Sequence, residues 1–254
     1  MVILPNCNNL IQIKYLVNIS KSMNKPEIFS FKVAINRCYI IRQKGSIMID
    51  GGSPNEIKSI EKSIRSFGLK PDEIKLVVLT HGHFDHAGSA GDIRDLTGAR
   101  LMIHKEDNDY IEKAEMIWPT GINRWGKITR SIFKTILVKS MTFPETKADI
   151  ILDTNEFSLL DYGIEGKVVH TPGHTAGSLS VLLDNGDAFV GCMAHNNPPF
   201  RLKPGYPIYA NDIELLKKSW EILINMGAKT IYPGHGDPFP VSVIERILEK
   251  EKRA

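Results

Sequence analysis

One short segment constrains this chain more than any other: residues 80–88, with the sequence THGHFDHAG. It follows directly on the apolar run KLVVLT, which is typical of a strand buried in a sheet. In an extended backbone, residues two apart point the same way, so His81 and His83 can reach one ion. Asp85 and His86 come where the chain turns into a helix, which makes a second, adjacent ion possible. The fold must therefore present this segment at a strand end with room for metal.

The rest of the chain alternates short β-rich runs with helical patterns, which indicates an α/β fold. In the first half we expect strands over 27–35, 37–43, 46–50, 75–80 and 99–104, and helices over 54–67 and 87–98. In the second half we expect strands over 156–161, 167–171, 178–183, 187–192 and 229–234, and helices over 211–227 and 241–252.

No linker interrupts this pattern. We therefore expect a single domain over 27–254, with a helical insert at about 107–148, and an N-terminal extension over 1–26 whose order the sequence leaves open.

The composition indicates no macromolecular partner. The 32 basic and 29 acidic side chains give a formal charge of +3, without the basic excess that nucleic-acid binders usually carry. Three scattered cysteines predict no disulfide framework and favour a reducing compartment. We see no signal peptide and no apolar run of the ~20 residues that a membrane span requires. We therefore expect a cytoplasmic protein with a small-molecule substrate and no nucleic-acid partner; a homodimer stays open.

Two further histidines lie at predicted strand ends beside glycines, which leave space for a metal. His170 ends the strand GKVVH in the stretch HTPGHTAGS, and His235 lies in YPGHG. We expect His174 to support His170 by hydrogen bonding and His104 to be structural. Together with the histidines and the aspartate of residues 81–86, His170 and His235 form a ligand set.

The motifs HGHFDH at 81–86, HTPGHT at 170–175 and PGHG at 233–236 resemble the metallo-β-lactamase superfamily, over roughly residues 27 to 240. The resemblance implies a four-layer αβ/βα sandwich of two mixed sheets flanked by helices, with metals in the cleft between the loops. By position it implies two ligand sets: His81, His83 and His170 for one ion, and Asp85, His86 and His235 for the other. Two zinc ions are expected, with iron or manganese open.

The same resemblance bears on two residues outside these sets. Asp50 in MIDGG matches an early aspartate that steadies the ligand loop; the alternative is a turn-forming aspartate. Cys192 in DAFVGCMAH departs from the pattern, because many of these hydrolases carry a bridging aspartate there. We expect its thiolate to bind the second metal, since zinc accepts thiolate readily. The alternative is a buried apolar cysteine.

The implied activity is hydrolysis. Zinc lowers the pKa of bound water from ~15.7 to about 7, so a metal-bound hydroxide can attack a carbonyl. Asp85 would bind the second metal and orient this nucleophile. We expect His195 to stabilise an oxyanion or protonate a leaving group; the alternative is a loop histidine without a role.

The substrate is less constrained. A lactone, thioester, ester or β-lactam fits; an iron-dependent sulfur or oxygen enzyme and a phosphodiester hydrolase are the alternatives. In the insert, Ile122, Trp125, Ile128, Ile132 and Ile136 share one helical face, opposite Arg124, Lys127, Arg130 and Lys134. We interpret it as a lid helix with its apolar face toward the cleft. The alternatives are a preference for an anionic or lipid-like substrate, or contact with a membrane surface.

Overall fold

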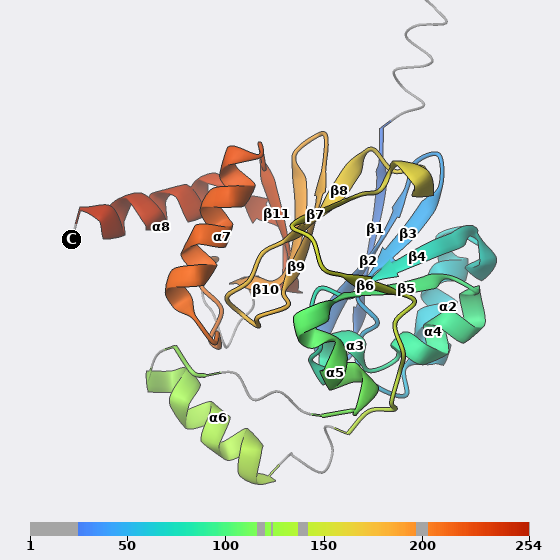
Figure 1. Cartoon of the computed structure of the whole chain (residues 1–254), viewed down its shortest axis with the longest axis horizontal. Coiled ribbons are helices and arrows are strands. Elements are labelled where there is room, and N and C mark those ends of the chain that lie inside the picture. Colours follow the sequence, from blue (N-terminus) through green and yellow to red (C-terminus); the bar gives the residue numbers. More distant parts are fainter. Residues whose placement is uncertain (1–24, 116–119, 123, 137–141, 197–202, 254) are drawn as a thin grey trace, which may run out of the picture.

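The structure is a computed structural model that describes residues 25–115, 120–122, 124–136, 142–196 and 203–253. Most of the predicted N-terminal extension lies outside these residues. In the described part of the chain, two six-stranded mixed sheets lie face to face, with helices on both outer sides (Figure 1). This arrangement confirms the predicted α/β sandwich.

Each sheet is built from one half of the chain. The first contains, in spatial order, β1 (Glu27–Val33), β2 (Asn36–Arg42), β3 (Ser46–Ile49), β4 (Ile74–Val78), β5 (Arg100–His104) and β6 (Ile150–Leu152). The second contains β12 (Phe239–Pro240), β11 (Thr230–Gly236), β10 (Asp187–Asn196), β9 (Leu179–Leu183), β8 (Gly166–His170) and β7 (Glu156–Ser158).

Helices cover the outer faces of both sheets. Those beside the first sheet are α2 (Ile57–Ser66), α3 (Phe84–Ala87), α4 (Ala90–Thr97) and α5 (Lys105–Glu112). Those beside the second are α7 (Ile213–Asn225) and α8 (Ser242–Lys252). Helix α6 (Arg124–Ile136) of the insert lies below the sheets in Figure 1, across from the lower end of α7.

Three apolar layers hold these elements together, and strand alternation sorts side chains between them. In β2, Cys38 and Ile40 face the helices, while Tyr39 and Ile41 face the second sheet. The second sheet buries its other face against α7 and α8, where Trp220 is 1% exposed. A chain with three such layers has four layers of secondary structure.

The predicted elements differ from the structure mainly at their ends. The helix expected over 87–98 begins only at Ala90, as α4, and the separate short helix α3 precedes it. Residues 86–89 bond to the loop after β3 instead of joining the two helices. Gly88 donates its N–H to the Gly52 carbonyl (2.9 Å), and the Ser89 hydroxyl donates to the Ser53 carbonyl (2.6 Å). The short strands β6 and β12 were not predicted.

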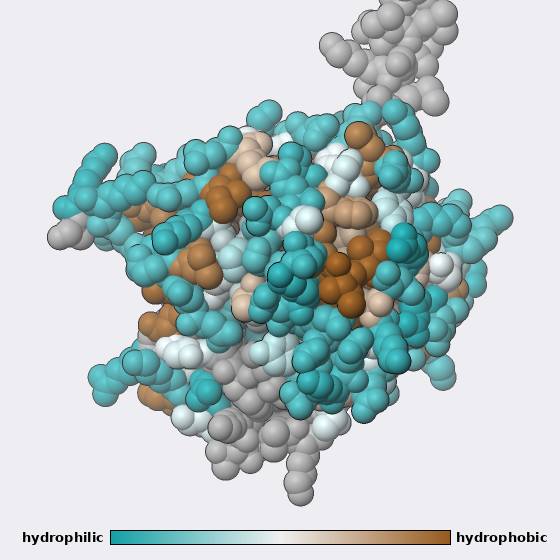
Figure 2. Space-filling model, viewed as in Figure 1, coloured by the Kyte–Doolittle hydropathy of each residue, from teal (hydrophilic) through white to brown (hydrophobic). Residues whose placement is uncertain are grey.

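The face in Figure 2 is largely hydrophilic, with an apolar patch near the edge strand β6, where Ile151 is 49% exposed. None of the described helices has the length and apolarity needed to cross a bilayer.

Tyr39 gives a test of how the two sheets are joined. Its ring packs between the sheets, and its hydroxyl donates to the Pro233 carbonyl on β11 (2.7 Å). Tyr39→Phe should lower the free energy of unfolding by about 1–3 kcal/mol, because it leaves a buried carbonyl without a donor. Urea unfolding in chelator measures this. Tyr162→Phe, whose hydroxyl makes only a 3.5 Å contact with exposed Arg100, should change little; equal losses in both variants would contradict the assignment.

Candidate metal centre

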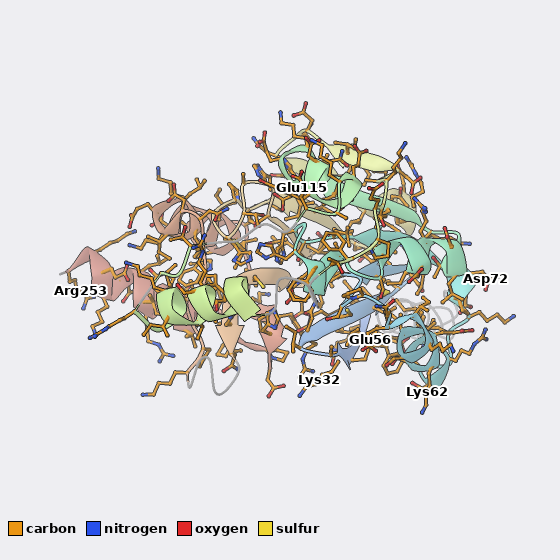
Figure 3. The ribbon with its side chains drawn as sticks, turned by 90° about the horizontal axis from the view of Figure 1, so that it is seen from below. Lys32, Glu56, Lys62, Asp72, Glu115 and Arg253 are labelled. Atoms are coloured by element: carbon orange, nitrogen blue, oxygen red, sulfur yellow. The ribbon has the colours of Figure 1, made fainter. Side chains whose placement is uncertain are left out.

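The loops that follow β4 and β8, together with the ends of β10 and β11, meet at the lower edge of the sandwich around α3 (Figure 1). Figure 3 views the molecule from this side, with α6 toward the viewer and charged side chains such as Lys62 and Arg253 at the periphery. Histidines, a carboxylate and a thiol from both halves of the chain cluster here, and every member is buried. Polar groups this dense and this buried need partners.

The first donor group consists of His81, His83 and His174, whose ligand atoms lie within 4.8 Å of one another. His81 and His83 follow β4 as predicted. His174 comes from the loop after β8, and its Nε2 lies 3.1 Å from Nδ1 of His83. The buried Nε2 of His81 has no hydrogen-bond partner among the described residues.

The third histidine of this group is therefore His174, where the sequence suggested His170. His170 is the last residue of β8, and its ring stacks on His104 of β5, with centroids 3.8 Å apart and planes 9° from parallel. Its Nε2–H donates to the Ala176 carbonyl (2.8 Å). His170 thus joins the two sheets, while the turn that follows carries His174 to the cluster.

The second donor group consists of Asp85, His86 and His235, the three residues expected for a second ion. Asp85 Oδ2 lies 3.2 Å from His235 Nε2, and the Nε2 atoms of His86 and His235 are 3.4 Å apart. Gly234 permits this approach, because a Cβ there would come within 2.6 Å of the His86 ring.

Hydrogen bonds at Nδ1 leave Nε2 as the free nitrogen on several of these histidines. His86 Nδ1–H donates to Asp50 (2.7 Å), and His235 Nδ1–H donates to the Ile35 carbonyl (2.9 Å). His174 Nδ1–H donates to the Tyr209 carbonyl (2.9 Å). An Nε2 lone pair directed into the cluster is what a metal ligand requires.

Asp50 supports two histidines at once. Its carboxylate accepts from His86 and from both the N–H and the hydroxyl of Thr80 (2.8 and 2.9 Å). Because the Thr80 hydroxyl donates to Asp50, its oxygen accepts from Nδ1 of His81 (3.1 Å). Asp50 therefore steadies the ligand loop and is no simple turn residue.

Cys192 lies between the two groups. Its Sγ is 3.2 Å from His86 Nε2, and it clusters with His81 and His86 on one side and with His195 and His235 on the other. Burial opposes ionisation of the thiol, but the neighbouring His86 and His235 lower its pKa well below the ordinary value. A thiolate in this position is a ready metal ligand.

His195 is also buried, at 5% exposure, in the same cluster. Burial lowers its pKa to about 4. Its position beside Cys192 was not among the ligand sets expected from the sequence.

The ionisation of the cluster is consistent with a cation site. Burial lowers the pKa of His83 to about 3, and the nearby His174 adds to this effect. Burial disfavours charge on His235 too, but Cys192 and Asp85 raise its pKa to about 10. In the protein alone, protons thus balance the thiolate and the carboxylate, and a bound cation would displace them.

The donor spacing also fits zinc. Two nitrogens at 2.0–2.1 Å from a tetrahedral ion lie ~3.3 Å apart. The pairs His83–His174 and His86–His235 are separated by 3.1 and 3.4 Å.

Sequence reasoning missed Asp107, which clamps the two loops of the first donor group together. Its buried carboxylate accepts from the Gly82 N–H (3.0 Å), between His81 and His83. It also accepts from the Thr175 hydroxyl (2.7 Å) and the Gly177 N–H (2.9 Å), in the loop that carries His174. No sequence motif marks it.

Helix α6 connects to the cluster through Tyr209. The Tyr209 hydroxyl bonds Thr129 of α6 (2.6 Å), while its carbonyl accepts from His174. Thr129 is buried and Ile128 is 47% exposed, so Ile128 does not pack inward as the lid interpretation predicted. The side chains of Trp125, Ile132 and Ile136 lie outside the described residues.

The family model of the metallo-β-lactamase superfamily matches residues 33–235. The chain belongs to this superfamily.

Similar proteins agree with this assignment. A probable metallo-hydrolase of Methanocaldococcus jannaschii is 27% identical over 204 residues, covering 78% of this chain and 86% of the relative. A metallo-β-lactamase family protein of Thermus thermophilus matches with a TM-score of 0.64 and 18% identity, covering 90% of this chain and 79% of that one. A subclass B3 metallo-β-lactamase of Bradyrhizobium japonicum matches with a TM-score of 0.58 and 20% identity, covering 90% and 91%. These structures confirm the metallo-β-lactamase fold.

The histidine pair 170 and 174 tests the first donor group. His174→Gln should weaken zinc binding at the first donor group by roughly 10–100-fold or more, because losing a donor costs at least as much as losing a residue that supports one. His170→Gln should leave zinc affinity within about twofold, since it has no place in the group. Zinc titration of metal-free protein measures both. A larger loss of zinc affinity in His170→Gln than in His174→Gln would instead support the set expected from the sequence, with His170 as the third ligand.

Asp107 is tested with a matched control on the same helix. Asp107→Asn should lower zinc affinity roughly 10–100-fold, because an amide cannot accept all three bonds and the two ligand loops separate. Asp109→Asn removes only an exposed pair with Lys113 and should leave affinity unchanged. Circular dichroism establishes that both variants are folded. Wild-type affinity in Asp107→Asn would show that the loops hold their positions without the clamp.

Proposed function

We propose that this protein is a hydrolase with two divalent metal ions, preferably zinc, that acts on a small carbonyl substrate such as a lactone, a thioester or other ester, or a β-lactam. The observation that carries the proposal is the pair of adjacent donor groups, His81–His83–His174 and Asp85–His86–His235, buried at one edge of the sandwich. When bound, zinc would lower the pKa of water and polarise a carbonyl oxygen.

The protein's own residues prepare the site for that chemistry. Asp50 and backbone carbonyls hold the histidines with Nε2 free, so little reorganisation is needed when ions bind. Asp85 offers Oδ2 toward His235, and as a carboxylate it can also accept a hydrogen bond from the attacking water and so orient it. Although burial favours the protonated carboxyl, His86 and His235 lower the pKa of Asp85 below its ordinary value.

The similar proteins support the reaction class and leave the substrate open. The relative from Methanocaldococcus jannaschii is named a probable metallo-hydrolase, and the Bradyrhizobium japonicum protein a metallo-β-lactamase. Tyr209 contacts His174 through its carbonyl and α6 through its hydroxyl. We therefore infer that the insert, with segment 203–210, forms one wall of the substrate pocket.

A second candidate is a non-hydrolytic enzyme that uses redox-active iron. The observation in its favour is the thiol of Cys192 between the two donor groups, in place of a carboxylate. Metal identity separates the two candidates.

The test is turnover of a lactone, a thioester, a β-lactam and a phosphodiester by the purified protein, with and without chelator, with metal content measured on the same sample. We expect chelator-sensitive turnover of one carbonyl class with zinc bound. Asp85→Asn should lower kcat about 10²-fold or more, because it removes a carboxylate that would orient the attacking water. Asp95→Asn, on the exposed face of α4, should leave it unchanged. Iron content without turnover would select the second candidate.

A further inference from the structure

His195 is a buried imidazole without a hydrogen-bond partner in the part of the chain that the structure describes. It is 5% exposed, and neither of its ring nitrogens bonds any described residue. Leaving such a group unpaired costs free energy, so a buried polar side chain of this kind indicates a missing partner.

The backbone fixes where this imidazole lies. The N–H and carbonyl of His195 both pair with Gly205 (3.0 and 3.1 Å) on one side, and His195 aligns with His235 of β11 on the other. The rings of His195 and His235 are 4.9 Å apart. A side chain held from both sides is positioned before any ligand arrives.

The available partners are a thiol and a second imidazole. Ligand atoms of Cys192, His195 and His235 lie within 4.8 Å of one another, and all three residues are buried. One thiolate with two imidazoles is a donor set that zinc accepts.

We propose that Cys192, His195 and His235 form a third ion position, the soft position, which competes with the hard position formed by Asp85, His86 and His235. The proposal rests on the proposed function, because it concerns how the second ion of the same centre is held. It assigns His195 to the ion instead of the substrate.

The soft and hard positions compete because both need His235 as a ligand. Its Nδ1–H donates to the Ile35 carbonyl, so Nε2 is the atom that it offers to either position. One nitrogen lone pair binds one ion, so the two positions cannot be filled together. The second ion therefore has two alternative places, one rich in oxygen and nitrogen donors and one with sulfur.

Ligand softness then decides which place is filled. Thiolate selects soft and borderline ions, whereas carboxylate suits manganese. We expect cobalt and cadmium at the soft position and manganese at the hard position. Zinc accepts thiolate, imidazole and carboxylate, so it is expected at both.

The test uses metal-free full-length protein titrated with Co²⁺, followed by its absorption spectrum. The second cobalt equivalent should produce a thiolate-to-cobalt charge-transfer band, which Cys192→Ser abolishes. His195→Gln should weaken that equivalent roughly 10–100-fold or more and shift its ligand-field bands. His104→Gln, a buried histidine outside the cluster, is the control and should match wild type. Unchanged affinity and spectra in His195→Gln would overturn the proposal.

Asp85→Asn provides an independent arm that leaves the soft position intact. We expect it to lose tight Mn²⁺ binding, measured by electron paramagnetic resonance, and to keep the cobalt charge-transfer band. Loss of both the Mn²⁺ binding and the cobalt band would mean that the second ion has one position, which includes Asp85 and Cys192, and would contradict the proposal. If wild-type protein binds two cobalt ions without a thiolate band, the soft position is refuted and the proposed hydrolase stands; if it binds no metal tightly, the proposed function itself fails.

Discussion

A single buried carboxylate connects the first sheet to the metal centre. Asp50 directly follows β3 and has a left-handed backbone (φ 64°), a conformation that aspartate adopts more readily than most residues. At 1% exposure its charge must be fully hydrogen-bonded, and Thr80 and His86 provide those bonds. Because β3 and β4 are parallel neighbours, their register determines where this carboxylate meets the loop after β4. The pairing of β3 with β4 therefore also determines where the ligands of the loop after β4 lie.

The site also depends on the docking of the two halves. The first half of the chain contributes His81, His83, Asp85 and His86, and the second contributes His174, Cys192 and His235. The apolar layer between the sheets, with Tyr39 against Phe189 at 5.0 Å between ring centroids, brings these sets together. The first and second donor groups each draw residues from both halves, so their metal affinity reports on the packing of the whole sandwich.

Much of the architecture could be predicted from periodicity, because buried strands and amphipathic helices leave strong patterns. The three-residue strand β6 could not, since so short a run is indistinguishable from a loop. His170 was assigned to the ion because it ends a strand, but the loop that follows decides which histidine reaches the cluster. One signal was present: His83, His174 and His235 each follow a glycine. Gly173 takes φ 137°, and a Cβ there would come within 2.5 Å of the α7 backbone.

Asp107 and His195 show a different limit of sequence reasoning. Asp107 acts through contacts with residues 25 and 70 positions away, which no local pattern encodes. His195 was expected to act on the substrate, but only the pairing of β10 with β11 brings it beside His235. Roles that arise from strand pairing appear only once the sheet is assembled.

The two bonds of Tyr209 have a consequence for how this protein can diversify. Its carbonyl holds a histidine of the metal cluster, and its hydroxyl holds the helix of the insert. A lineage that exchanged this insert for one with a different pocket wall would also alter the support of that histidine. The proposed pocket wall and the metal affinity would therefore change together, and an engineer who replaces the insert must rebuild the contact between Tyr209 and Thr129 to keep that affinity.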